Sequence, residues 1–284
     1  MTTQVLTEVL QRVESLPRLP DSSLRLLKVL SEPNSTIAEI VESIRYDQTV
    51  TADLLRMCNS SHYGLSRQIA SVDQAISLLG TAKVLQLVMA AHMQAMFSKP
   101  QEGYGLRPGA LWIHSVAVAL GCQIFAKQWG LAEVGLVFTA GLMHDIGKVV
   151  LNEYVGSEYA EIARRVADEG ISFLEGEQQV LGFTHPDIGA HIANQWGLPE
   201  PIVRCIRYHH EPESLSKPDP LVDVVHLADA VCLVLAIGGG DDGLLYRAHP
   251  AVMERHNVTE PNLENVGADI ILELKSVQQD FNVN

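Results

Sequence analysis

Residues 142–151 read LMHDIGKVVL and place His144, Asp145 and Lys148 inside a segment that is apolar on both sides. Asp and Lys are rarely buried in proteins unless they are paired. A buried charge without a partner is costly, or a shift in its pKa neutralises it. Any fold of this chain must therefore provide internal partners for three ionisable side chains, and the rest of the sequence should supply them.

Helix signals dominate the sequence, and strand signals are weak. Capping-box patterns, Thr36 with Glu39 and Ser71 with Gln74, precede apolar runs of helical period. No Asn-Gly or Asp-Gly turn separates two alternating runs as a hairpin would require. A stretch rich in Pro, Gly and polar residues, SKPQEGYGLRP at 98–108, interrupts the helical pattern. The sequence therefore predicts an all-α chain in two helical lobes.

The second lobe shows a series of apolar runs of helical length, with Pro or Gly near several of their ends. The expected helices are 109–129, 134–155, 157–169, 172–181, 186–196, 199–210 and 220–237, with one or two more between 241 and 284. The opening segment thus falls inside one expected helix.

The charge balance restricts the partners of the chain. Its 34 acidic residues against 20 basic ones give a formal net charge of −14, and no basic run of four or more residues occurs. Nucleic-acid backbones and anionic membranes attract basic patches. The N-terminus lacks the features of a signal peptide, and the most apolar segment, 221–237, is shorter than the roughly 20 residues of a spanning helix. We expect a cytoplasmic protein that binds neither nucleic acid nor membranes.

Further His and Asp residues stand at special positions in the second half. His114 lies inside an apolar helix, and His185 is expected at the cap of a helix that begins with Pro186. His209 and His210 end a helix, and Asp229 lies on one that is apolar on nearly every side. Taken alone, each histidine is more simply a hydrogen-bonded core residue.

Taken together, these residues indicate a metal site, provided that their helices converge. Several nitrogen donors and at least two carboxylates suit Mn, Fe or Zn better than Ca or Mg. Two carboxylate-bridged metals could activate a water and hold a phosphoryl group, and a nearby ammonium would stabilise the developing charge. The expected metal ligands are His114, His144, Asp145, His185, His209, His210 and Asp229, with Asp145 and Lys148 as catalytic candidates. His209 and His210 remain alternatives for one ligand position.

The motifs resemble a known family. HDIGK at 144–148, with the histidines and Asp229 around it, is similar to the HD superfamily of metal-dependent phosphohydrolases. LLRMCNSSHYGLSRQIASVDQAISLLG at 54–80 resembles the NS-x-x-[FY]-G and A-[IV]-x-x-LG pattern of the HDOD family, the HD-related output domains of bacterial signalling. The resemblance covers residues 16–237, with lobes at 16–99 and 106–237, and leaves 238–284 as a C-terminal helical extension.

The resemblance implies an all-helical fold whose second lobe is an HD-like bundle, and a regulatory or output role in bacterial signal transduction. It also implies a signalling protein partner, with a nucleotide or phosphoester as a further possible ligand. Asn59 and Ser60 belong to the signature; we expect them to end a helix and fix the 59–70 loop, with partner binding as the alternative.

Two departures bear on enzymatic activity. The loop after His210, EPESLSKPDP, lacks the GYP motif of the cyclic di-GMP phosphodiesterases, and Ala110 stands where those enzymes often carry an acidic ligand. We therefore do not expect cyclic di-GMP cleavage. Three hypotheses remain: a signalling module that works through protein contacts, a metal-dependent phosphohydrolase acting on a nucleotide or phosphoester, and a metal-dependent binder without turnover.

Overall fold

The structure is a computed structural model that describes residues 2–16, 18–31, 36–45, 47–59, 69–131, 134–240 and 246–281. Apart from one isolated bridge between Gln101 and Leu106, these described residues form helices, turns and loops, so the all-α prediction is confirmed. The first helices are α1 (Thr2–Ser15), α2 (Asp21–Ser31), α3 (Ile37–Arg45), α4 (Gln48–Cys58), α5 (Val72–Leu79) and α6 (Thr81–Phe97).

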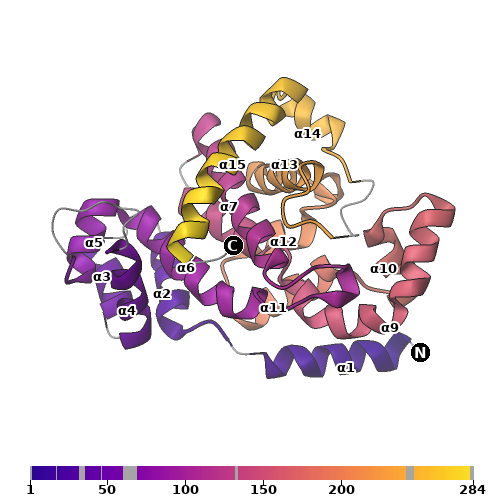
Figure 1. Cartoon of the computed structure of the whole chain (residues 1–284), viewed down its shortest axis with the longest axis horizontal. Helices are drawn as coiled ribbons and strands as arrows, with labels where there is room; N and C mark the ends of the chain where they lie inside the picture. The colour runs from indigo at the N-terminus through magenta and orange to yellow at the C-terminus, as the bar shows by residue number, and fades with distance from the viewer. Residues whose placement is uncertain are drawn as a thin grey trace.

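The remaining helices follow the short 3-10 turn η2 (Glu102–Tyr104), which lies in the expected break between the lobes. They are α7 (Ala110–Gln128), α8 (Val134–Met143), α9 (Ile146–Glu169), α10 (Phe173–Leu181), α11 (His185–Gln195), α12 (Glu200–Tyr208), η3 (Pro212–Ser214), α13 (Pro220–Val234), α14 (Pro250–Arg255) and α15 (Glu260–Phe281). In Figure 1, α2 to α5 gather on one side, whereas α7 to α15 form the larger bundle.

Local side-chain hydrogen bonds fix the ends of the first helices. The backbone amide of Thr36 donates to the Glu39 carboxylate at 2.8 Å, and the amide of Glu39 donates to Thr36 Oγ1 at 3.3 Å, which forms the expected capping box before α3. Ser71 caps α5 by accepting from the amide of Gln74 at 3.3 Å. Helix starts of this kind are readable from sequence because both partners lie three residues apart.

Asn59 ties together the two ends of the loop that follows α4. Its side-chain amide donates to the carbonyl oxygens of Leu55 and Ile69, both at 2.8 Å, while its Oδ1 accepts from the amide of Ile69 at 2.7 Å. The expectation that Asn59 ends its helix and fixes the loop is thus confirmed, whereas Ser60 lies outside the described residues.

Helix α7 forms the centre of the second lobe and is buried on nearly every side, from Leu111 to Ala126. It packs against α8, α13 and α15, and Figure 1 shows α15 running down from α14 alongside it. By length and composition α7 could span a membrane, as could α5 with α6 if that pair, bent by 118°, is taken together. However, 83% of the apolar window of α7 is buried within the structure.

The expected continuous helix over 134–155 is wrong, because the chain breaks at His144 and Asp145. The Nδ1–H of His144 donates to the carbonyl oxygen of Gly141 at 2.7 Å. A side chain that occupies such a carbonyl competes with continuation of the helix. The side chains of both residues at this break are fully buried.

Gly147 allows α9 to start directly against α11. A Cβ atom at this position would lie 1.9 Å from the carbonyl oxygen of His185 and 2.8 Å from the amide nitrogen of Gly189. Both neighbours are backbone atoms, which cannot rotate out of the way. The glycine of the HDIGK motif therefore serves the close approach that brings His185 beside Asp145.

We predict that Gly147→Ala lowers the free energy of unfolding by about 3 kcal/mol, at the upper end of the cost of overpacking a core. Denaturant unfolding of the full chain measures this change. Gly239→Ala is the matched control, since its Cβ would meet no atom closer than 3.6 Å. Equal stability of the two variants would contradict the proposed close approach.

Candidate metal centre

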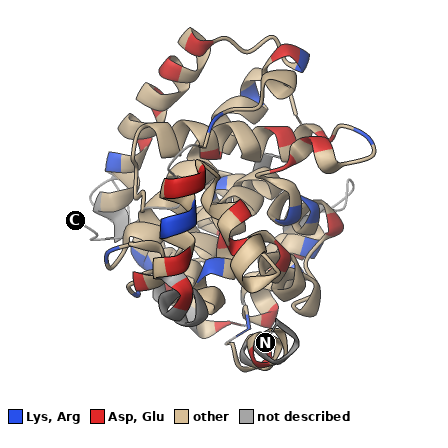
Figure 2. Cartoon of the chain, turned by 90° about the vertical axis from the view of Figure 1, so that its right-hand side faces the viewer, with Lys and Arg blue, Asp and Glu red and all other residues tan. Residues whose placement is uncertain are grey.

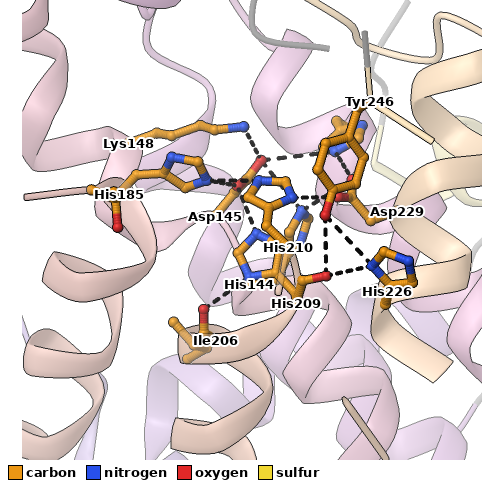
Figure 3. A network of polar contacts seen from close by, with 12 residues as sticks. His144, Asp145, Lys148, His185, Ile206, His209, His210, His226, Asp229 and Tyr246 are labelled. Atoms are coloured by element: carbon orange, nitrogen blue, oxygen red, sulfur yellow. Dashed lines mark hydrogen bonds and ion pairs between the residues drawn. The ribbon is translucent and has the colours of Figure 1, made fainter. Parts of the chain in front are cut away.

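The side chains of all seven expected metal ligands lie in one buried cluster. Figure 3 shows those of His144, Asp145, His185, His209, His210 and Asp229. His114 comes from the first turns of α7, His144 and Asp145 from the break before α9, and Asp229 from the middle of α13. The remaining ligand candidates come from helix ends: His185 is the first residue of α11, and His209 and His210 follow α12. The N-cap of α11 is Thr184, one residue before the position expected for the cap.

The candidate ligands form two groups. One group holds Asp145, His185, His209 and His210, and within it the possible ligand atoms all lie within 4.8 Å of one another. The second group holds His114, His144 and Asp229, with the same limit. Both His209 and His210 belong to the first group, so the structure offers both as ligands rather than one in place of the other.

Asp145 lies between the two groups. Its Oδ1 is 3.3 Å from Nε2 of His185 and 3.8 Å from Nε2 of His209. Its Oδ2 is 3.3 Å from Nε2 of His144 and 3.8 Å from Nε2 of His114. Each carboxylate oxygen thus faces a different group, which is the arrangement that a bridging carboxylate requires.

Asp229 closes the cluster on the opposite side. Its Oδ1 is 3.1 Å from Nε2 of His114 and 3.6 Å from Nε2 of His144. Its Oδ2 is 3.5 Å from Nδ1 of His210, a residue of the other group. The two carboxylates therefore both connect the groups, although Asp145 does so more symmetrically.

Backbone carbonyls orient three of the histidines. A carbonyl oxygen only accepts, so the Nδ1 atom of each ring carries a proton and Nε2 is the atom directed into the cluster. The pairs are His114 with Ile237, His144 with Gly141 and His209 with Ile206, at 3.0, 2.7 and 2.8 Å. Metal-binding histidines typically have such outer hydrogen bonds.

Glu177, which the sequence did not single out, orients His185. The fully buried carboxylate accepts from the backbone amide of His185 at 2.8 Å and from its Nδ1 at 2.9 Å. The hydroxyl of Tyr104 donates to the other oxygen of Glu177 at 2.7 Å. No periodic or motif signal marks Glu177 or Tyr104, because their partners lie 8 and 73 residues away along the chain.

The unpaired polar atoms of the protein interior concentrate in this cluster. Of the seven buried side-chain atoms that have no hydrogen-bond partner within the described ranges, five belong to it. They are His144 Nε2, Asp145 Oδ1, His209 Nε2, His210 Nδ1 and Asp229 Oδ2. Buried polar atoms are nearly always satisfied. Nitrogen and carboxylate atoms that face one another without partners fit a divalent metal, so this cluster could hold one.

Lys148 has an internal partner, which answers the question raised by the opening segment. Its Nζ lies 2.6 Å from Oδ2 of Asp145, and both side chains are buried. The ammonium also lies 5.7 Å from the centre of the Tyr104 ring. Burial acts to raise the pKa of Asp145, but the positive charges of His144 and Lys148 hold it well below its usual value. The carboxylate is therefore ionised at neutral pH.

The carboxylates also separate the histidines by protonation state. Burial acts to lower the pKa of His144, but Asp145 and Asp229 outweigh it and raise the pKa to about 10. Burial is likewise outweighed at His185, where Glu177 contributes most to a pKa of about 9. At His209 burial and the neighbouring His144 lower the pKa to about 3.

Two other residues of α13 lie outside the cluster. His226 and Asp223 lie one and two steps of three residues before Asp229, and each such step turns a helix by about 60°. His226 donates from Nδ1 to the carbonyl oxygen of His209 at 2.7 Å and accepts from the amide of His249 at 2.8 Å. Asp223 pairs with Arg255 at 2.7 Å. Only Asp229 reaches the candidate metal ligands.

The C-terminal segment covers the cluster. The ring of Tyr246 packs at 4.3 Å from the ring of His210, and its hydroxyl lies 3.4 Å from the carbonyl oxygen of His209. Gly238 approaches so closely that a Cβ there would lie 2.4 Å from the carbonyl oxygen of Ala110. The crevice beside Lys148, under Gly238 and Gly239, has no room for a water molecule. The centre is therefore closed on this side.

The remaining histidines that the structure describes make contacts outside the candidate metal centre. His92 hydrogen-bonds to Ser23 at 2.8 Å, and His191 to Gln195 at 3.2 Å. His249 caps α14, and His256 bonds to Asp223 and stacks on Trp129 with ring centres 3.7 Å apart. His62 lies outside the described residues.

We predict that the affinity for a divalent metal rises as the pH is raised toward 9. With pKa values of about 10 and about 9, His144 and His185 carry protons at neutral pH, and these protons must leave when the nitrogens bind a metal. Metal binding at pH 7 should therefore release about two protons per chain. Calorimetric titration in buffers of different ionisation enthalpy measures the release. A pH-independent affinity without proton release would contradict this assignment.

Comparison with solved structures supports the fold. An HDOD domain protein of unknown function from Geobacter sulfurreducens is 27% identical in sequence and superposes with a TM-score of 0.75. The superposition covers 98% of this chain and 97% of the Geobacter chain. A proposed phosphohydrolase from Shewanella amazonensis SB2B is 24% identical, covers 97% and 98%, and gives a TM-score of 0.69. The second likeness concerns the fold alone.

The chain matches parts of two curated relatives that are longer than it is. An uncharacterized protein of Treponema pallidum (strain Nichols) is 24% identical over 80% of this chain, which spans 44% of its length. Ribonuclease Y of Aquifex aeolicus (strain VF5) is 32% identical over 42% of this chain, which spans 16% of that enzyme. The family model described as HDOD domain matches residues 16–212. Because this match includes more than half of the residues of the chain, the chain belongs to the HDOD family.

Proposed function

We propose that this chain is a regulatory module of bacterial signal transduction that binds divalent metal, Fe, Mn or Zn, in the buried His/Asp centre. The observation that carries the proposal is the group of five buried ligand atoms around Asp145 that lack hydrogen-bond partners within the described part of the chain. Membership of the HDOD family supports the signalling role. The module would act through contacts with a signalling protein or through a bound ligand.

Two metal ions fit the donor arrangement better than one. The candidate ligands divide into two groups, and the oxygens of Asp145 face different groups. One group offers three histidines and the other offers two histidines and Asp229. Imidazole and carboxylate donors together suit Fe, Mn and Zn.

The covering of the centre favours regulation over hydrolysis. Lys148, the residue expected to face a phosphate, is buried and bound to Asp145, and the crevice beside it admits no water. A phosphoester substrate would need a space of small-molecule size at this position. Tyr246 and Gly238 occupy the surroundings of the centre instead.

A metal-dependent phosphohydrolase that acts on a nucleotide or phosphoester is the second candidate function. It is favoured by the adjacency of Lys148 to Asp145 and by the partial similarity to ribonuclease Y. When bound, the metal would supply Lewis-acid stabilisation of a phosphoryl oxygen and an acidified water. Asp145 would then hold the metal, and Lys148 would stabilise the negative charge of the phosphate.

Metal analysis of the full chain, purified without chelators or a metal-affinity tag, tests the proposal. We expect one to two equivalents of Fe, Mn or Zn per chain, lost in Asp145→Asn because the carboxylate between the two groups becomes neutral. Asp223→Asn is the matched control, since Asp223 is also buried but pairs with Arg255 outside the centre.

Turnover of phosphodiester and phosphomonoester substrates by the same samples separates the two functions. The regulatory proposal predicts metal binding without turnover. Turnover in the natural chain and in Asp223→Asn, lost in Asp145→Asn, would replace it with the phosphohydrolase function. A chain that neither contains metal nor takes it up on reconstitution would overturn both.

A further inference from the structure

A pocket of about 360 Å³ opens at the surface beside the candidate metal centre. We call it the access pocket; it lies where α10, the start of α11 and the end of α12 meet. Its lining includes Glu175, Asp187, Arg207, His210 and Glu211. Its position is separate from the closed crevice beside Lys148, whose described lining shares no residue with it.

His210 borders both the access pocket and the metal centre. Among the seven candidate ligands it is the only one that lines this pocket. Its side chain is 8% exposed, whereas those of Asp145 and His209 are fully buried. Within the centre its Nε2 lies 3.1 Å from Nε2 of His185, and its Nδ1 has no hydrogen-bond partner in the described structure. The ring of His210 thus lies between the pocket and the centre.

The rim of the access pocket carries an excess of negative charge. Its lining holds three acidic residues, Glu175, Asp187 and Glu211, and one guanidinium, that of Arg207, which lies 3.0 Å from Asp187. Acidic residues are spread over the face shown in Figure 2, in keeping with the net charge of −14. A concave surface lined with one sign of charge raises the local concentration of the opposite ion. This pocket therefore attracts cations and repels free phosphates.

The other approach to the centre is unsuited to cations. The crevice on the side of Lys148 admits no water molecule and is lined by apolar side chains such as Leu111 and Leu233. The charges of Lys148 and Asp145, which both line it, are paired with each other at 2.6 Å, so the crevice offers a cation no free carboxylate at its mouth. A hydrated metal ion thus meets a closed crevice on one side and an open pocket with an acidic lining on the other.

We infer that the access pocket is the route by which divalent cations enter and leave the buried centre, and that His210 is the ligand they meet first. The inference rests on the proposed metal-binding function. Rotation of the His210 ring removes the barrier between pocket and centre without moving a helix. The rim charges lie outside the ligand groups, so their removal should change the rate of uptake while the Co²⁺ content at saturating metal stays the same.

Stopped-flow uptake of Co²⁺ by the metal-free full chain, followed by the visible absorption of bound Co²⁺, tests this route. In Glu175→Gln/Glu211→Gln we expect uptake to slow by about 3- to 10-fold at low ionic strength. The amide oxygen introduced at position 175 can still accept from the backbone of Ser172, so the capping box of α10 is kept. In Arg207→Gln we expect faster uptake, because the guanidinium no longer offsets Asp187. Both changes should shrink at high salt, while the equilibrium Co²⁺ content stays unchanged.

Glu273→Gln, an exposed acidic residue on α15, is the matched control and should leave the rate unchanged. Leu233→Ala widens the crevice beside Lys148 and should also have no effect on uptake. Two results would overturn the access route and leave the metal site intact. In the first, Co²⁺ binds normally but the uptake rate is the same in the pocket variants as in the natural chain. In the second, uptake becomes faster only in Leu233→Ala. A chain that binds no Co²⁺ would overturn the proposed function together with the route.

Discussion

The carboxylate of Asp145 is the group on which the second lobe depends. It is fully buried and lies within 3.8 Å of four histidine nitrogens and within 2.6 Å of the Lys148 ammonium. A charge in such a position requires partners from several directions. The break between α8 and α9, the missing side chain at Gly147 and the ends of α11 and α12 all bring those partners within reach.

Features whose cause is local were predictable from sequence. The capping box at Thr36 and the role of Asn59 depend on residues that lie close by along the chain. The set of candidate ligands was also recognisable, because ionisable side chains on otherwise apolar helices are rare unless they are paired. The break at His144 was not, since a ring nitrogen that binds the carbonyl of Gly141 leaves the apolar pattern unchanged.

Features that depend on distant contacts were missed. Glu177 and Tyr246 have no motif of their own, and their importance comes from His185 and His210, which only the fold brings beside them. The same holds for closure of the centre. The segment after α13 covers it, and His226 bonds to both the His209 carbonyl and the His249 amide. His226 therefore links the backbone of the candidate ligand His209 to the start of α14. A change at the metal centre could reach the C-terminal helices through these hydrogen bonds.

We propose that Asp145 joins two metal positions inside the buried centre. Anomalous X-ray scattering from crystals of the metal-loaded full chain, collected at the absorption edge of the bound metal, tests it most directly. The account predicts two peaks, one on each side of the Asp145 carboxylate. Peaks only at the protein surface, or a centre without any peak in crystals of the loaded protein, would contradict it.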